Sequence, residues 1–315
     1  MLYLKIIQYT EREGRSQTLK IYDYVYGQKI EGRHVLALGL FDGVHLGHRQ
    51  LIEEARLLSV KLGASLSVFT FKAENSLLKG GERIYSTEKK LSILESLSVG
   101  EVIMTDFSAV SKISAVDFAR SVFSDMGAAV AVCGADFKFG KGAVGNTELL
   151  SRVACEYDAS LLLVDEVTMH GEKISSGKIK ALLSEGKIKE ANELLGQRLS
   201  SNLKVLHGDG RGQSLGYPTV NTECDAFSSL LRKGVYKTEV SIDKKIHTGI
   251  TNVGVCPTFE KRKTHTETYI LDFSGDLYGK EISISFIDFL RPEIEFKTKE
   301  ELILQIKRDE KSVRK

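Results

Sequence analysis

Two histidines three residues apart occur in the stretch GLFDGVHLGH, residues 39–48, which follows an apolar run. Gly43 and Gly47 would let the backbone approach a ligand closely. His48 falls in the first turn of the helical pattern that follows, where free amides and the positive helix pole favour phosphate. His45 and His48 could therefore donate hydrogen bonds to phosphate oxygens. A turn before a helix with incidental histidines is the alternative.

Two further stretches in the same part of the chain have residues suited to phosphate or a cofactor. GADFKFGKGAVGN (134–146) follows an apolar run and combines glycines with an acid and two aromatic side chains. ISSGKI (174–179) places two serines and basic residues at the start of a helical pattern, where phosphate can bind. Either stretch could instead be structural, and a helix cap is the simpler interpretation of ISSGKI alone.

A different pattern occupies the last third of the chain. HGDGRGQSLGYPTVNT (207–222) has four glycines in nine residues, followed by Thr219 and Asn221. Magnesium prefers oxygen ligands, takes few from protein and leaves other positions to phosphates and water. A glycine-rich loop beside a strand with two oxygen ligands predicts a Mg·ATP site, and a hairpin with a flexible loop is the alternative.

The elements that must position these residues change along the chain. Up to about residue 178, apolar runs alternate with helical patterns, which predicts a Rossmann-like, doubly wound parallel sheet. The predicted strands are 34–40, 65–71, 101–105, 128–134 and 160–167. The predicted helices are 48–63, 87–100 and 114–127.

The later part of the chain predicts a helical connector and then a small antiparallel β-barrel. The connector, about 178–196, reads as two short helices broken at Gly186. A capping box of Thr298 and Glu301 predicts a C-terminal helix. The predicted barrel strands are 203–207, 234–242, 245–255, 265–273 and 281–290.

Composition limits the class of protein. A chain of 315 residues favours two domains, and a net charge of +2 gives no reason to expect nucleic-acid or membrane binding. Its four cysteines show no C-x-x-C pairing, so neither a disulfide scaffold nor a zinc site is expected. No run approaches the ~20 apolar residues of a membrane helix. We expect a cytoplasmic protein, and its oligomeric state is not predicted.

The motifs together resemble a known family. GxFDGVHxGH, GxDFxFGxxxxGN and ISSxxI, in this order, resemble the adenylyltransferase module of the bacterial bifunctional riboflavin kinase/FMN adenylyltransferase, or FAD synthetase. PTxN and the DLYGK turn resemble its riboflavin kinase module, and the resemblance spans about 31–309. It implies that ATP phosphorylates riboflavin to FMN and then adenylylates FMN to FAD, releasing pyrophosphate. The implied domains are 1–184 for the adenylyltransferase and 185–315 for the kinase.

The resemblance also implies roles for individual residues. His45 and His48 would hold ATP phosphates, and Glu267 would be the general base toward the riboflavin 5′-hydroxyl. Thr219 and Asn221 would bind Mg²⁺. The implied nucleotide-binding residues are Phe41, Asp42, Gly43, Gly47, Ser175, Ser176, Lys178, Lys180, Gly208, Gly210, Gly212 and Gly216. The implied flavin-binding residues are Asp136, Phe137, Asn146, Arg291 and Glu293, with Arg291 pairing with Glu293 as one option.

The chain departs from the family pattern at three places in its first half. Leu40 stands where Asn is usual, FKAEN (71–75) replaces an F-x-P-x-P segment, and SSGKIK replaces SSTxIR. Lysine at 180 keeps the charge of arginine without its forked geometry. Two alternatives therefore stay open: a riboflavin kinase with a weakened or inactive adenylyltransferase half, and a flavin- or nucleotide-binding regulator without catalysis.

Overall fold

Two compact units make up the chain, Met1–Ser175 and Ser176–Lys315. The computed structural model describes residues 4–6, 19–72, 82–207, 212, 215–222, 226–256 and 263–314. The division falls one helix before the expected boundary at 184/185. Within the described ranges, no helix has the length and apolarity needed to cross a membrane.

A seven-stranded sheet forms the first unit, in the order β1-β2-β5-β4-β3-β6-β7. All neighbouring strands are parallel except β1 and β2. This confirms the predicted Rossmann-like sheet and its five strands, whereas β1 and β2 at the edge were not predicted. The strands are β1 (Leu4–Ile6), β2 (Lys20–Asp23), β3 (His34–Leu38), β4 (Ser65–Phe71), β5 (Glu101–Thr105), β6 (Ala128–Gly134) and β7 (Ser160–Val164).

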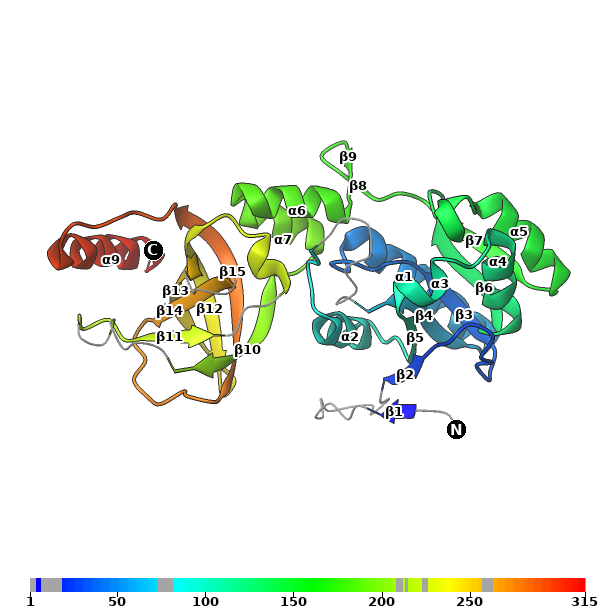
Figure 1. Ribbon diagram of the computed structural model, residues 1–315, viewed down its shortest axis with the longest axis horizontal. Coiled ribbons are helices and arrows are strands. Elements are labelled where there is room, and N and C mark those ends of the chain that lie inside the picture. Colours follow the sequence, from blue (N-terminus) through cyan, green and yellow to red (C-terminus); the bar gives the residue numbers. More distant parts are fainter. Residues whose placement is uncertain are drawn as a thin grey trace. The chain divides into compact units, whose positions relative to one another are not determined.

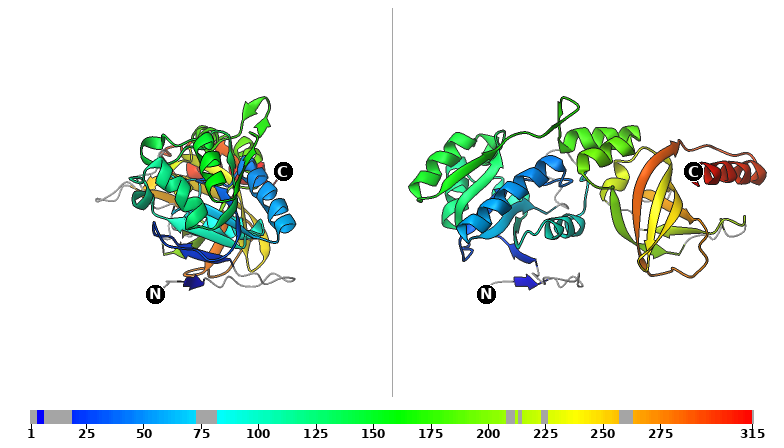
Figure 2. Two further views of the ribbon diagram at one scale, coloured as in Figure 1. Left: turned by 90° about the vertical axis from the view of Figure 1, so that its right-hand side faces the viewer. Right: turned by 180° about the vertical axis from the view of Figure 1, so that it is seen from behind.

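Helices cover both faces of this sheet (Figure 2). Residues of α4 and α5 share one core cluster with Leu36 and Leu38 of β3, while α1 packs on β3, β4 and β6. Serine N-caps begin α2 and α4, and Gly63 in the left-handed conformation ends α1. The remaining elements of this unit are α1 (Leu46–Leu62), α2 (Thr87–Ser96), α3 (Phe107–Val110), α4 (Ala115–Ser124), η1 (Lys141–Ala143), α5 (Thr147–Glu156), β8 (Thr168–Met169) and β9 (Glu172–Lys173).

The strand order creates a switch point between β3 and β6. From β3 the chain proceeds through β4 to β5 on one side, and it later continues through β6 to β7 on the other side. Ligands of open α/β sheets bind beyond the carboxyl ends of strands at such a point. The stretches 39–48 and 134–146 follow these two strands, so the fold places both at the expected crevice.

The second unit begins with two short helices and continues as a closed barrel (Figure 1). Gly186 and Gly196 both adopt positive φ angles, 80° and 68°, which separates α6 from α7 and ends α7 as predicted. The barrel order is β10-β11-β14-β13-β12-β15, with antiparallel neighbours. The elements are α6 (Ser176–Glu185), α7 (Ile188–Leu195), β10 (Ser200–Leu206), β11 (Thr219–Thr222), η2 (Ala226–Ser229), β12 (Gly234–Ile242), β13 (Lys245–Cys256), β14 (Lys263–Ile270), β15 (Glu281–Arg291) and α9 (Lys299–Val313).

Successive side chains along each barrel strand point alternately into the barrel and to its outer face. Thr238, Thr251 and Thr268 are fully buried, and their hydroxyls form a chain with oxygen separations of 2.8 and 2.9 Å. Because successive strand residues face opposite sides, burial of Thr268 leaves its neighbours Glu267 and Tyr269 on the outer face. The C-terminal helix α9 packs against β13.

Candidate active sites

The loop between β3 and α1 brings the two predicted histidines together. His45 is the N-cap of α1, and its Nδ1 accepts a hydrogen bond from the backbone amide of His48 at 3.4 Å. The imidazole rings stack with centroids 3.7 Å apart. Phe41 and Val44 hold positive φ angles of 51° and 41°, which is costly for residues with side chains, and both are fully buried. Packing therefore holds a strained loop in one shape.

Both histidines are neutral at ordinary pH. Burial lowers the pKa of His45 to about 4, although the neighbouring Asp42 carboxylate opposes the shift. Burial, with smaller contributions from His45 and Lys90, also places the pKa of His48 well below its usual value. Since Nδ1 of His45 accepts a bond, its proton must be on Nε2. Nδ1 of His48 is buried and has no hydrogen-bond partner among the described residues, so it is an atom that a ligand could satisfy.

Asp42, predicted to bind nucleotide, has structural contacts in this loop. Its Oδ1 accepts a hydrogen bond from the Ile84 amide at 2.9 Å, and its Oδ2 lies 3.7 Å from Nη1 of Arg83. Both side chains are about 5% exposed or less. Asp42 thus links the segment around residue 84 to the histidine loop. The sequence did not predict its partner Arg83.

The two glycines of the loop have different surroundings. Gly43 adopts a φ of 85°, a conformation that favours glycine. A Cβ on Gly47 would lie 3.3 Å from both Cε1 and Nδ1 of His45, so this position in α1 must stay small for the ring to lie as it does. The motif therefore needs these glycines to shape the histidine site.

The stretch after β6 has both exposed and structural residues. Asp136 is exposed, and its carboxylate accepts a hydrogen bond from Nζ of Lys173 on β9 at 2.6 Å; Glu166 also pairs with this lysine. The Phe137 ring lies 5.5 Å from that of Phe139. Asn146 is the N-cap of α5, its Oδ1 accepting from the Leu149 amide at 3.0 Å. Sequence reasoning missed Lys173 and Glu166.

The predicted serines and lysines lie where the two units divide. Ser175 is the last residue of the first unit, and Ser176 begins α6. Lys178 and Lys180 lie in its first turns, where their side chains and those of both serines are half-buried. Ile179 between the lysines is fully buried, which anchors this helix start.

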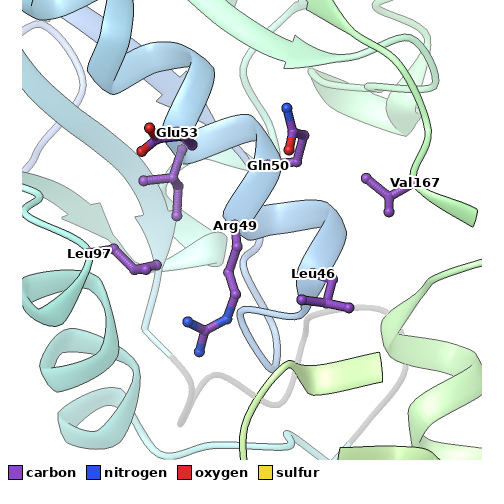
Figure 3. Close-up of a pocket in the computed structure, with 7 residues that line it drawn as sticks. Leu46, Arg49, Gln50, Glu53, Leu97 and Val167 are labelled. Carbon is purple, nitrogen blue, oxygen red and sulfur yellow. The ribbon is translucent and has the colours of Figure 1, made fainter. Parts of the chain in front are cut away.

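A cavity lies along α1. It encloses about 390 Å³, within the usual size of ligand pockets. Figure 3 shows Leu46, Arg49, Gln50 and Glu53 projecting from α1, with Leu97 and Val167 on either side. None of the site residues predicted from the sequence lines this cavity. The cavity and the predicted phosphate-binding residues therefore do not coincide in this unit.

In the second unit, three predicted residues share the outer face of the barrel. Thr219 and Asn221 are two positions apart on β11, and Asn221 lies opposite Glu267 of β14. The Thr219 hydroxyl donates a hydrogen bond to Oε1 of Glu267 at 2.5 Å. All three side chains are half-buried. A hydroxyl, an amide and a carboxylate therefore meet at one place, each with oxygen atoms that could bind a cation or accept a proton.

The backbone at two glycines, Gly212 and Gly254, comes close to side chains on this face of the barrel. A Cβ on Gly212 would lie 2.9 Å from Oγ1 of Thr219, so only glycine fits there. On β13, Asn252 lies opposite Glu267, and a Cβ on Gly254 would lie 2.6 Å from Oε1 of Glu293. Glu293 thus lies over the same face as the cluster, and Asn252 is a neighbour that sequence reasoning missed.

The remaining predictions have different outcomes. Arg291 pairs with Asp309 of α9, with Nη2 to Oδ2 at 2.8 Å, so the option that it pairs with Glu293 is wrong. The cause is the docking of α9, which brings a largely buried carboxylate to the guanidinium. Gly216 lies in an exposed turn with φ 82°. Gly208, Gly210 and the end of FKAEN lie outside the described residues.

Comparison with known proteins finds relatives that match both units of the chain. A family model described as FAD synthetase matches residues 27–178, and one described as riboflavin kinase matches residues 195–315. A bifunctional riboflavin kinase/FMN adenylyltransferase from Listeria monocytogenes is 32% identical over 287 residues, covering 89% of this chain and 91% of its own. The protein of that name from Bacillus subtilis is 32% identical over 288 residues, with the same coverage. The chain belongs to this family.

A solved structure extends the likeness to the whole chain. The crystal structure of a protein named macrolide-efflux protein, from Streptococcus pneumoniae, superposes with a TM-score of 0.83 at 28% identity. It covers 94% of this chain and 98% of the other. The two-unit architecture of this family member is therefore present in a second protein whose name refers to a different process.

Proposed function

We propose that the chain carries out both reactions of its family, with the adenylyl transfer in residues 1–184 and the riboflavin phosphorylation in residues 185–315. Riboflavin, FMN and ATP are the substrates, and FAD is the final flavin product. The two family matches, at residues 27–178 and 195–315, support this division. Free Cys133 and Cys155 fit a reducing compartment, and we place the protein in the cytoplasm.

In adenylyl transfer, an oxygen of the FMN phosphate attacks the α-phosphorus of ATP. The bond from that phosphorus to the oxygen leading to the β-phosphate breaks, and pyrophosphate leaves. His45 and His48 donate hydrogen bonds to phosphate oxygens as negative charge builds during attack. Their burial supports this role, because hydrogen bonds in a site without water stabilise developing charge more strongly.

Ser175, Ser176, Lys178 and Lys180 bind the ATP phosphates at the start of α6. The backbone amides and positive pole of a helix N-terminus suit an anion, and the two ammonium groups add positive charge. Asp136, Phe137 and Asn146 are the residues that we assign to the flavin. The capping bond of Asn146 uses its Oδ1, so its Nδ2 is the group we assign to the ligand.

In riboflavin phosphorylation, Glu267 takes the proton of the riboflavin 5′-hydroxyl. That oxygen bonds to the γ-phosphorus of ATP, the bond to the β-phosphate oxygen breaks, and ADP leaves. The observation that carries this assignment is the meeting of Thr219, Asn221 and Glu267 on one face of the barrel. Gly212 lets the glycine-rich segment approach this face.

Thr219 and Asn221 fit the oxygen ligands of Mg²⁺ and would hold it beside the nucleotide. No group of three or more His, Cys, Asp or Glu side chains in the described part of the chain could hold a metal ion. A cation with few protein ligands, completed by phosphates and water, is consistent with that arrangement. When bound, Mg²⁺ neutralises phosphate charge during transfer.

The test is a time course. The protein is incubated with riboflavin, ATP and MgCl₂, and riboflavin, FMN and FAD are separated by chromatography. We expect FMN to form first and FAD to follow. Formation of FMN without FAD, also when FMN is supplied directly, would overturn the adenylyltransferase assignment and favour a silent first unit. Absence of both products would overturn the whole proposal.

A further inference from the structure

A buried lysine lies beneath the histidine loop. Lys90 is in the first turns of α2 and is only 4% exposed. Its Nζ donates hydrogen bonds to the carbonyl oxygen of Phe71 at 2.5 Å and to Oγ1 of Thr70 at 3.2 Å. The carbonyl oxygen of Leu40 lies 3.5 Å away. An ammonium group in the interior requires such partners, because burial removes its hydration.

The acceptors of Lys90 come from the ends of two adjacent strands. Leu40 follows β3 and opens into the histidine loop, while Thr70 and Phe71 end β4. The Thr70 hydroxyl also donates to the Leu40 carbonyl at 2.9 Å. One network therefore fixes the position at which the chain leaves β3, next to the strained residue Phe41.

The space beside Lys90 is too small for a substrate. The cavity that Lys90 lines, together with Phe41, Asp42 and Gly43, has a volume of only about 10 Å³. Such a space holds at most one water molecule, so neither a flavin nor a nucleotide can enter it. The pKa of His48 nevertheless responds to Lys90. Burial lowers this pKa most, His45 lowers it further, and the positive charge of Lys90 adds to the effect.

We propose that Lys90 is a positioning residue for adenylyl transfer to FMN, which holds the Leu40 and Phe71 carbonyls and thereby keeps His45 and His48 in place for phosphate. This inference rests on the proposed function of the first unit. Small displacements of binding groups cost large factors in rate, and a loop with strained residues relaxes when its anchor is removed.

The experiment compares Lys90→Met, Thr70→Val and the double variant in the full-length protein. Met keeps a long apolar stem without donors, and Val keeps the shape of Thr without the hydroxyl. We expect kcat for FAD formation to fall roughly 10- to 100-fold in Lys90→Met and less in Thr70→Val. The double variant should lose less than the product of the two, because both groups bind the Leu40 carbonyl.

Two readouts separate positioning from general damage. Riboflavin phosphorylation, measured on the same preparations, should be unchanged, as should both activities of the exposed control Lys112→Met. The acid limb of the pH profile for FAD formation should move to higher pH in Lys90→Met. Among the described residues, the charged or titratable groups around His48 and its loop are His45, Lys90, Asp42, Arg83, Arg49 and Lys173. Loss of one cation raises the pKa of His48.

The outcomes are distinct. Folded Lys90→Met with the kcat and pH profile of the unaltered protein would overturn the inference. If that variant does not fold, Thr70→Val decides, and an unchanged kcat for FAD formation in it would overturn the inference equally. Failure of the unaltered protein to form FAD would instead refute the proposed function of the first unit.

Discussion

In the first unit the candidate phosphate-binding groups are histidines packed inside a strained loop, whereas in the second they are oxygen-bearing side chains on a barrel surface. His45 is 6% exposed, and burial keeps it neutral. Thr219, Asn221 and Glu267 are half-buried and are positioned by strand register and by the hydrogen bond from Thr219 to Glu267.

The two candidate sites would bind the same anionic ligand in different ways. Neutral donors in a dry site make strong hydrogen bonds and need no counter-charge until phosphate enters. Oxygen ligands on a surface suit a hydrated cation, which then attracts phosphate. The first arrangement needs a rigid loop with buried anchors, and the second needs only adjacent strands and a close backbone at Gly212.

The largest effect should come from the barrel carboxylate. Glu267→Gln removes the proposed base and keeps the shape, so FMN formation should fall about 10²- to 10⁴-fold. FAD formation from supplied FMN should not change, because it uses the other unit. Chromatographic rates for both reactions check this. The control Glu281→Gln makes the same change at an exposed position of β15 and should leave both rates intact. An equal loss of both reactions in a folded Glu267→Gln protein would mean that the sites are not separate.

The complementary change removes a buried histidine. His48→Asn should lower FAD formation about 10²- to 10³-fold, the usual cost of a lost donor to developing negative charge, while FMN formation continues. His170→Asn is the matched control, because His170 is exposed and has a φ of 54°, a conformation that asparagine tolerates. Unchanged FAD formation in His48→Asn would show that the buried pair does not act on phosphate.

Periodicity predicted most of the fold, and its failures have local causes. Apolar runs predicted the five parallel strands. Segments between turn residues, in which apolar and polar residues alternate, predicted the barrel. β2, Lys20–Asp23, is too short and too mixed in polarity to stand out. α5 was missed because its N-cap, Asn146, was assigned to a ligand, although an asparagine before Thr147–Glu156 is also a helix start signal.

The candidate sites were predictable where a motif is contiguous and not where distant segments meet. His45 with His48 comes from a single loop, and a family resemblance named Thr219, Asn221 and Glu267. The partners Arg83 of Asp42 and Lys173 of Asp136 come from other segments, and ion pairs between loops have no sequence period. The pairing of Arg291 with Asp309 depends on how α9 docks, which no local pattern specifies.

Lowering the pH should reduce the stability of the first unit through His45. Its folded pKa of about 4 lies below the unfolded value of about 6.5, so the unfolded chain binds a proton first as pH falls. Stability from keeping His45 neutral is therefore present above pH 6.5 and is lost between about 6.5 and 4. The loss is on the order of 3 kcal/mol.

Urea unfolding at several pH values measures this contribution. Between pH 6.5 and 4, the free energy of unfolding should fall less in His45→Gln than in the unaltered protein, and His170→Asn should behave like the unaltered protein. Groups away from residue 45 are the same in all three proteins, so the difference belongs to His45 and to His48, whose pKa His45 lowers. Parallel curves for His45→Gln and the unaltered protein would show that burial of His45 costs nothing in acid.

The smallest expected effect tests whether the shape of the histidine loop matters apart from its chemistry. Gly47→Ala keeps every donor but places a methyl group 3.3 Å from the His45 ring, which must move by a few tenths of an ångström. Because Gly47 is in the first turn of α1, alanine should stabilise the helix by less than the roughly 1 kcal/mol found in a helix interior. FAD formation should nevertheless fall about tenfold in kcat/KM, since the stacked pair is displaced. Gly100→Ala, whose new Cβ would have its nearest neighbour at 3.8 Å, is the control. A protein with higher stability and lower FAD formation would establish that the buried site depends on exact ring placement, a demand that the open barrel site does not make. Unchanged FAD formation would remove that distinction between the units.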